Sequence, residues 1–292
     1  MLLVAKLSFI LRPILIFFPK SIKLGSYKMF LDARDNANYR YRKHGDNYEK
    51  TLVDGFLNFI SNNPKSYVID VGASYGAYTL KAANIGQYGL VKKIFSFEPD
   101  ETVFQSLEKS IDANKFSDLI ELNRFIIGDY DGEANLLLSH RASTSNQTFF
   151  SRQNTTASKS SVSVPCTTLD SLLDKTLNFS DENFIIKIDV EGSELRVLKG
   201  MKKILSSSKG YALFCEYYPQ GIIDCGNSIE DFKKYITDIK TDQFLIVKNT
   251  KLKKISKDDL FNIFKELDEK SNNLESLIAF EFVASYNLDF QE

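Results

Sequence analysis

Short apolar runs alternate with longer amphipathic segments along most of the chain. Residues 67–69 form an unbroken apolar run, which predicts a strand buried on both faces. Asp70 ends this strand, and Gly72 and Gly76 mark a loop whose backbone can approach a ligand closely, because no Cβ stands in the way. Helix-forming residues continue from Gly76. The pattern therefore predicts a unit of strand, glycine loop and helix.

The same alternation continues through the rest of the chain. It predicts helices at 48–60, 101–114, 193–205, 229–239 and 258–270, and strands at 93–97, 119–127, 134–138, 184–188, 211–215, 244–247 and 277–284. Strands that alternate with helices indicate an α/β fold, doubly wound around a mostly parallel sheet. No helix follows the last apolar run, so we expect that run to insert antiparallel at the edge of the sheet.

Two segments depart from this pattern. Residues 1–24 are rich in Leu, Ile and Phe but are interrupted by basic residues such as Lys6, Arg12 and Lys20, and their longest uncharged run is too short to span a bilayer. They lack the layout of a signal peptide, so we expect a helical extension that packs on the domain or lies on a membrane surface. Residues 139–163 are rich in Ser, Thr, Asn and Gln. They predict a polar loop, either a mobile one or a substrate lid.

Residues 28–44 mix aromatic and charged side chains, which predicts a short strand and a loop. We therefore divide the chain into an N-terminal extension, residues 1–47, and a Rossmann-like domain, residues 48–292. The length of 292 residues suits one domain with such an extension.

Composition excludes several functional classes. The net charge of −1 provides no basic field for nucleic acid, so we expect no nucleic-acid partner. The three cysteines, Cys166, Cys215 and Cys225, form no CxxC pair, which indicates a reducing, cytoplasmic compartment. Only two histidines are present, which excludes a histidine-rich metal site.

The second predicted strand ends in an acidic residue, Glu98, followed by Pro99. At this place in a nucleotide-binding sheet one carboxylate can accept hydrogen bonds from both ribose hydroxyls. Ser74 and Ala77 stand where a dinucleotide fingerprint has glycine, so the loop is a poor cradle for pyrophosphate. A nucleoside without phosphates, such as S-adenosylmethionine (SAM), fits better. The alternative is an ordinary strand-turn-helix with a chance acid.

Three acidic residues follow two later strands of the same predicted sheet. Asp189 and Glu191 come directly after the strand at 184–188, across the crevice from the glycine loop, and Glu216 closes the next strand. Three such acids can be a general base with its orienting partners, or part of an oxygen-ligand site for a metal such as Mg²⁺. In the alternative interpretation Asp189 or Glu191 merely caps the following helix, a role that Ser193 could also fill.

Taken together, these segments resemble the FkbM family of SAM-dependent methyltransferases. The resemblance covers about residues 48–219. It rests on VIDVGASYGAYT at 68–79, FSFEPD at 95–100, the helix that ends at Asn114, TTLDSLL at 167–173, IKIDVEGSELRVLKGM at 186–201 and FCEYYP at 214–219. It implies a seven-stranded class I methyltransferase fold. It also implies O-methylation, often of a sugar hydroxyl in a glycan or a glycosylated metabolite.

With this resemblance, the candidate residues take on roles. We expect the methionine end of SAM to be held by Asp70, Gly72, Ala73 and Gly76. We expect its ribose to be held by Glu98 with Pro99, and its adenine by Gly128 with Asp129. We expect Asp189 or Glu191 to be the base that deprotonates the hydroxyl, with Glu216 supporting it. His140 is a lesser candidate for the base.

Other interpretations stay open at this point. The chain could be a nucleoside-binding module that has lost its chemistry, or an NAD-type oxidoreductase that shares the sheet. The expected partner is a carbohydrate or a glycosylated small molecule. A helix within residues 1–24 would place the enzyme at the inner face of a membrane, as a peripheral protein.

Overall fold

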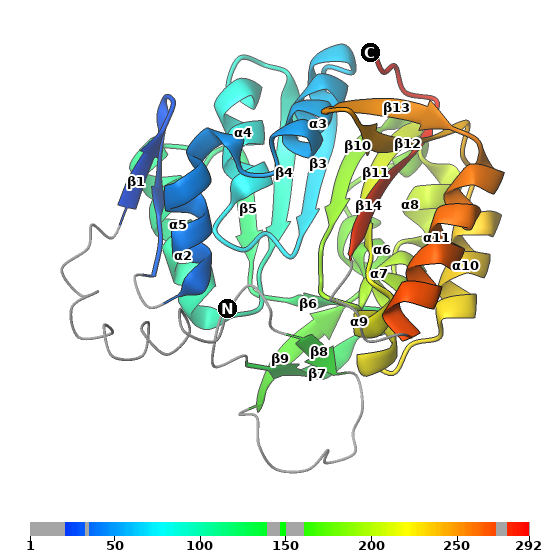
Figure 1. Cartoon of the computed structure of the whole chain (residues 1–292). Coiled ribbons are helices and arrows are strands. Elements are labelled where there is room, and N and C mark those ends of the chain that lie inside the picture. Colours follow the sequence, from blue (N-terminus) through cyan, green and yellow to red (C-terminus); the bar gives the residue numbers. More distant parts are fainter. Residues whose placement is uncertain (1–20, 33–34, 139–146, 150–160, 273–278, 292) are drawn as a thin grey trace.

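The computed structural model describes residues 21–32, 35–138, 147–149, 161–272 and 279–291. Within these residues the main sheet has eight strands, labelled in Figure 1. In spatial order they are β13 (Lys251–Ile255), β12 (Gln243–Lys248), β14 (Phe280–Tyr286), β11 (Gly210–Tyr217), β10 (Asn183–Ile188), β3 (Ser66–Val71), β4 (Val91–Phe97) and β5 (Ile120–Asn123). The strands from β11 to β5 run parallel, whereas β14 is antiparallel to both of its neighbours.

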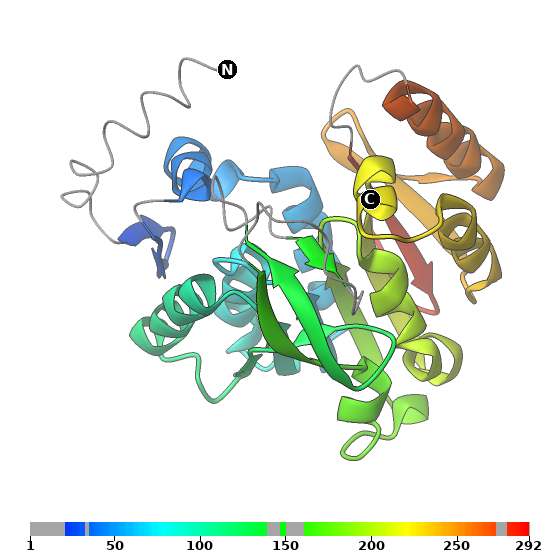
Figure 2. The same ribbon diagram turned by 90° about the horizontal axis from the view of Figure 1, so that it is seen from below.

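Helices cover both faces of this sheet, as Figures 1 and 2 show. One face is covered by α3 (Lys50–Asn62), α4 (Ala77–Gly86) and α5 (Glu101–Asn114), and the other by α6 (Leu169–Leu173), α7 (Glu194–Lys199), α8 (Lys202–Ser207), α9 (Pro219–Asp224), α10 (Ile229–Asp238) and α11 (Lys257–Asn272). Alternate residues of a strand point to opposite faces. Val68 therefore packs with the first group of helices, and Ile69 and Val71 pack with the second. This confirms the predicted doubly wound α/β fold.

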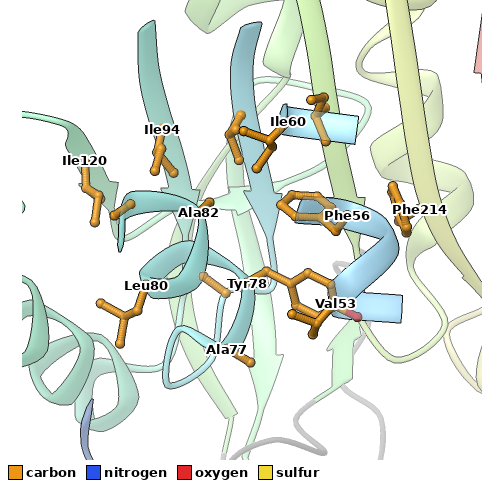
Figure 3. Packing of buried hydrophobic residues seen from close by; sticks show 14 of the residues in the cluster. Val53, Phe56, Ile60, Ala77, Tyr78, Leu80, Ala82, Ile94, Ile120 and Phe214 are labelled. Atoms are coloured by element: carbon orange, nitrogen blue, oxygen red, sulfur yellow. The ribbon is translucent and has the colours of Figure 1, made fainter. Parts of the chain in front are cut away.

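An aromatic cluster joins α3 to the sheet on the first face. The ring of Phe56 lies 5.2 Å from that of Tyr78 and 5.2 Å from that of Phe214, with near-perpendicular planes (Figure 3). Edge-to-face contacts of this kind add to the free energy gained by burying the rings. The cluster holds α3 and α4 over the strands that carry the candidate residues.

The described part of the N-terminal extension packs on the same face. Strands β1 (Ser21–Leu24) and β2 (Tyr27–Phe30) form a hairpin whose backbone bonds to α5. The N–H groups of Lys28 and Phe30 donate to Asn114 Oδ1 and Ser110 Oγ, each at 2.8 Å. The predicted short strand is confirmed, but residues 36–44 form a helix, α2 (Asn36–His44), rather than a loop.

The remaining predictions for the extension are not decided by the structure. Residues 1–20 lie outside the described residues, and 21–24 are strand β1 rather than helix. Membrane contact through residues 1–24 and a domain boundary at residue 47 stay predictions. In the described part of the chain, no helix is both long enough and apolar enough to cross a membrane.

A second sheet begins where the main sheet ends. Within the described residues it contains β6 (Ile126–Ile127), β9 (Ser161–Thr167), β7 (Gly132–Leu137) and β8 (Gln147–Phe149), in that order. Because β6 starts three residues after β5, this sheet extends from the carboxyl edge of the main one, and Figure 1 shows it below that edge. The predicted polar loop therefore contains two strand segments. Residues 139–146 and 150–160 lie outside the described residues.

Four sequence predictions of individual elements need correction. The strand predicted at 119–127 is two strands in different sheets, because pairing with β4 ends at Asn123. The helix predicted at 193–205 is two helices divided near Gly200, where a Cβ would lie 1.9 Å from the carbonyl oxygen of Gly128. The last strand, β14, is antiparallel as expected but lies between β11 and β12, not at the edge. An eighth strand, β13, extends the predicted seven within the described residues.

The aromatic cluster generates a first prediction. Replacing Phe56 by Ala removes a fully buried ring and leaves a cavity against Tyr78 and Phe214. We expect the free energy of unfolding, measured by urea denaturation, to fall by about 3–5 kcal/mol. As a control, Tyr88→Ala, at a side chain that is 79% exposed, should change it by less than about 0.5 kcal/mol. Equal losses in the two variants would contradict the packing role of Phe56.

Candidate functional site

The predicted glycine loop follows β3 and is held by the strand's last polar residue. Asp70 is buried, and its Oδ2 accepts hydrogen bonds from the N–H of Thr79 at 3.1 Å and from Thr79 Oγ1 at 2.6 Å. Burial raises the pKa of Asp70 to about 6, although both bonds from Thr79 oppose this rise. Asp70 thus ties the first turn of α4 to β3, and it fixes the shape of the loop between them.

The two loop glycines are required by neighbouring protein atoms. Gly72 has φ +83°, and a Cβ there would lie 1.9 Å from the carbonyl oxygen of Asp189. Gly76 has φ +91°, and a Cβ there would lie 2.6 Å from a methyl carbon of Leu107. The described contacts show that glycine at these positions admits other parts of the chain, and close approach of a ligand to the loop stays a prediction. The Gly72 contact also brings the glycine loop against the acidic loop.

Glu98 lies directly beside the glycine loop, as the sequence predicted. Its Oε2 accepts from the N–H of Ser74 at 2.9 Å, and its Oε1 accepts from the N–H of Asp100 at 2.8 Å. The side chain is 7% exposed, and burial raises its pKa to about 8. Each carboxylate oxygen keeps a further lone pair for a hydroxyl donor. Pro99, the next residue, is half-buried.

Gly128 and Asp129 follow β6 and are fixed by other elements. The Gly128 N–H donates to the carbonyl of Thr167 in β9 at 2.9 Å. Asp129 is exposed, and its carboxylate pairs with Arg196 Nη1 in α7 at 3.1 Å. These contacts attach the predicted adenine position to β9 and α7. Its role toward adenine stays a prediction.

The acidic loop follows β10 in a strained conformation. Glu191 has φ +54° and Gly192 has φ +106°, so the chain turns sharply after Asp189. Glu194 stabilises this turn, because its Oε1 accepts from the N–H groups of Val190 and Gly192, each at 3.1 Å. In the described part of the chain Ser193 occupies the N-cap of α7 without a capping bond from its side chain. Because Ser193 occupies the N-cap position, neither Asp189 nor Glu191 is the N-cap residue of this helix.

The register of the paired strands places the acids and a lysine on one face of the sheet. Lys187 pairs with Asp70 in β3 and with Phe214 in β11, and Glu216 pairs with Glu281 in β14. Since every second residue shares a face, these side chains lie on the face of the sheet that carries α3 and α4. The set on this face is Asp70, Lys187, Asp189, Glu216 and Glu281.

Burial and mutual repulsion separate the charge states of these acids. Burial, followed by the charges of Asp189, Glu194 and Glu191, raises the pKa of Glu216 to about 10. Burial also raises the pKa of Glu191 to about 8, with Asp189 and Glu194 acting in the same direction and Arg40 against it. At neutral pH Glu216 and Glu191 therefore carry protons. Asp189, whose side chain is 33% exposed, lies beside the cation Lys187.

Tyrosines from the N-terminal region cover this end of the sheet. Tyr41 of α2 is buried, with its ring 4.7 Å from that of Tyr48 and 6.2 Å from that of Tyr75 in the glycine loop. Burial raises the pKa of Tyr41 well above its usual value, and the nearby charges of Glu49, Asp189 and Asp70 add to the rise. The sequence pattern did not indicate that tyrosines cover this end of the sheet, because it predicted a loop where α2 forms.

Sequence analysis also left Lys187 without a role and missed Glu281. Both are charged residues inside otherwise apolar strands, FIIKI and FEFVA. A lone charge in a buried run calls for a partner. The lone charge in each of these two apolar strands could therefore have indicated that Lys187 and Glu281 form a pair. The earlier candidate His140 lies outside the described residues.

The metal interpretation finds no support in the described part of the chain. No group of three or more His, Cys, Asp or Glu residues there is arranged to hold a metal ion. Asp189 and Glu281 instead share a lysine.

The shape of the acidic loop generates a second prediction. An alanine Cβ at Gly192 would lie 2.1 Å from the carbonyl oxygen of Gly221, a backbone atom that cannot turn away. Gly226 also has positive φ, at +72°, but a Cβ there meets nothing within 4 Å. We expect Gly226→Ala to lower the free energy of unfolding by about 1–2 kcal/mol, the cost of the left-handed conformation. Gly192→Ala should lower it by clearly more in the same denaturation assay. Similar losses would mean that the close contact is not maintained in solution.

A family model of the methyltransferase FkbM domain matches residues 70–238, more than half of the chain. A search of the curated proteins returns no match.

Two solved structures are similar to the chain. The crystal structure of methyltransferase FkbM from Methylobacillus flagellatus KT is 16% identical, with a TM-score of 0.44 over 76% of this chain and 44% of that one. M. jannaschii TYW2, solved in complex with AdoMet, is 12% identical, with a TM-score of 0.42 over 93% of this chain and 86% of that one. The present chain thus spans less than half the length of the M. flagellatus protein.

The match at residues 70–238 covers the elements that build the site, from the end of β3 to the end of α10. It includes the glycine loop, Glu98 and the acidic loop. The family predicted from the sequence is confirmed: the chain belongs to the methyltransferase FkbM domain family.

Proposed function

We propose that this protein is a SAM-dependent O-methyltransferase that methylates a hydroxyl of a sugar, in a glycan or a glycosylated small molecule. One observation carries the proposal. The glycine loop, with Glu98 beside it, and the acidic loop, with Asp189, meet at the same edge of the sheet through the contact of Gly72 with Asp189. A cofactor site and a proton acceptor are thereby held next to each other.

The residues present fit SAM. Glu98 offers two oxygens that can each accept one ribose hydroxyl in addition to its backbone donors. Among the described residues, Ser74 Oγ is buried beside Glu98 without a hydrogen-bond partner, so a ligand group can satisfy it. Gly72, Ala73 and Gly76 line the loop that would hold the methionine end, and Asp70 fixes that loop. SAM supplies a methyl group on a positively charged sulfur, ready for displacement.

Asp189 is the residue best placed to act as the base. The proton on a sugar hydroxyl must leave as the oxygen attacks, and an ionised carboxylate at the site can accept it. Glu191 and Glu216 already carry protons at neutral pH, with pKa values near 8 and 10. The side chain of Asp189 is 33% exposed and pairs with Lys187. Glu191 and Glu216 can then donate hydrogen bonds to the acceptor.

The chemistry of the acid cluster supports a hydroxyl-bearing acceptor. Within the described residues, the Oε2 atoms of Glu194, Glu216 and Glu281 are buried and have no hydrogen-bond partner. Carboxyl groups in that state are satisfied by O–H groups, which both donate and accept. An anionic acceptor would instead be repelled by Asp189 and Glu281. A neutral, polyhydroxylated molecule such as a sugar therefore suits the site.

The cofactor role of Glu98 generates a third prediction. Glu98→Gln should weaken SAM binding, measured by isothermal titration calorimetry, by about 1–3 kcal/mol. Ribose hydroxyls favour the ionised carboxylate, and the pKa of Glu98 is about 8, so SAM binding at pH 7 should release a proton. The variant should abolish this release, measured in buffers of different ionisation enthalpy.

Glu101→Ala is the matched control, because this exposed residue lies nearby at the start of α5 and pairs with Arg124. It should leave SAM affinity and proton release unchanged. Unaltered affinity in a folded Glu98→Gln variant would remove Glu98 from the site. Binding of NAD in place of SAM would favour the oxidoreductase alternative.

The assignment of the base generates a fourth prediction. Asp189→Asn should lower the transfer of labelled methyl groups from SAM to cellular glycan extracts roughly 10²–10⁴-fold, with SAM affinity nearly intact. Glu191→Gln, which removes a carboxyl that is protonated at neutral pH, should lower transfer much less. A larger loss in Glu191→Gln than in Asp189→Asn would assign the base to Glu191. If the wild-type protein bound SAM but transferred nothing, the binding-module alternative would replace the proposal.

A further inference from the structure

Lys187 is a cation deep inside the sheet. It lies in β10 between isoleucines, and its side chain is 1% exposed. Its Nζ lies 2.9 Å from Glu281 Oε1 and 3.4 Å from Asp189 Oδ2, so it bridges the two carboxylates. A buried lysine loses its hydration and persists only where charges or hydrogen bonds replace the water.

The bridge spans three strands of the sheet. Glu281 lies in β14, and β11 separates β14 from β10. Glu281 is the register partner of Glu216 in β11, so Lys187 reaches past that strand to bind it. The insertion of β14 between β11 and β12 is what brings a carboxylate to this position.

Other charged and titratable groups face Lys187 from the elements packed around it. On α4, the ring of Tyr78 lies 5.2 Å from Nζ, and the Tyr78 hydroxyl donates to Glu49 Oε2 at 3.0 Å, just before α3. Asp70 on β3 is the register partner of Lys187. The negative charges of Asp189, Glu281 and Glu49 raise the pKa of Lys187 well above its usual value, although burial alone would lower it. Lys187 therefore stays a cation throughout the physiological range.

We propose that Lys187 and Glu281 are positioning residues: Glu281 anchors the ammonium group from one side, and the ammonium group holds the Asp189 carboxylate in its place after β10. This rests on the proposed role of Asp189 as the base. The shorter contact is to Glu281 and the longer one to Asp189. Glu281 thus shares the cation with Asp189. Lys187 and Glu281 do not touch the reacting atoms.

The test follows the charge on Asp189 directly. Carboxyl ¹³C chemical shifts are recorded across pH in protein labelled at Asp and Glu carboxyl carbons, with Asp189→Asn used to assign the Asp189 signal. The double variant Lys187→Met/Glu281→Gln removes the cation without stranding its main anion. We expect its Asp189 midpoint to rise relative to the wild type, because the cation 3.4 Å from the carboxylate is lost, and the simultaneous loss of the Glu281 charge offsets only part of this rise.

The single variant Glu281→Gln separates the two roles. It leaves Lys187 with one fewer carboxylate, so the ammonium group interacts more strongly with Asp189 and the Asp189 midpoint should fall. Opposite shifts in the two variants would not result from a purely structural role. If the double variant does not fold, the single variant decides by itself: an unchanged Asp189 midpoint in Glu281→Gln overturns the proposal.

Lys233→Met is the matched control. Lys233 is also a mostly buried lysine in an ion pair, with Asp268, but it lies in α10 on the opposite face of the sheet. It should leave the Asp189 midpoint where it is. An unchanged midpoint in Lys187→Met/Glu281→Gln, or an equal shift in Lys233→Met, overturns the proposal. The titration needs neither SAM nor an acceptor, so shifted midpoints in a protein that transfers no methyl group would defeat the proposed function while upholding the positioning of Asp189.

Discussion

The close approach of Gly72 to Asp189 is the contact on which the site depends. The N–H of Asp189 donates to the carbonyl of Val71 at 3.0 Å, and the missing Cβ of Gly72 leaves room for the Asp189 carbonyl. The two loops follow the neighbouring parallel strands β3 and β10, so displacing either loop would separate it from the other. Glycine at this one position lets the chain after β3 and the chain after β10 turn against each other. The cofactor side and the acid side become one site.

Charge is distributed unevenly around that contact. The described acids near it outnumber the one buried lysine, and burial favours the neutral form of each surplus carboxyl. Glu216 and Glu191 respond by keeping protons, with pKa values near 10 and 8. Asp189 has both solvent contact and a neighbouring cation, Lys187. Carboxyl groups in different surroundings thereby meet at one edge of the sheet.

Much of the site could be predicted from local sequence. An apolar run that ends in an acid or a glycine marks the carboxyl end of a strand, and that rule alone located Glu98, Asp189 and Glu216. The rule says nothing of what each side chain contacts. Asp70 was assigned to the cofactor, which stays a prediction, and its described bonds to Thr79 show in addition that it supports the loop. Asp129, assigned to adenine, pairs with Arg196 from a helix 67 residues away in sequence.

The sequence by itself determined the alternation of strands and helices, the family and the identity of the acidic candidates. Each of these is written in short-range patterns, because hydrophobic period and strand-end residues are local properties. Only the tertiary structure decided the rest. The insertion of β14 inside the sheet placed Glu281 opposite Glu216 and within reach of Lys187, and helix α2 brought Tyr41 over the glycine loop. Strand order and burial depend on packing between distant segments, and burial in turn set which carboxyl groups keep their protons.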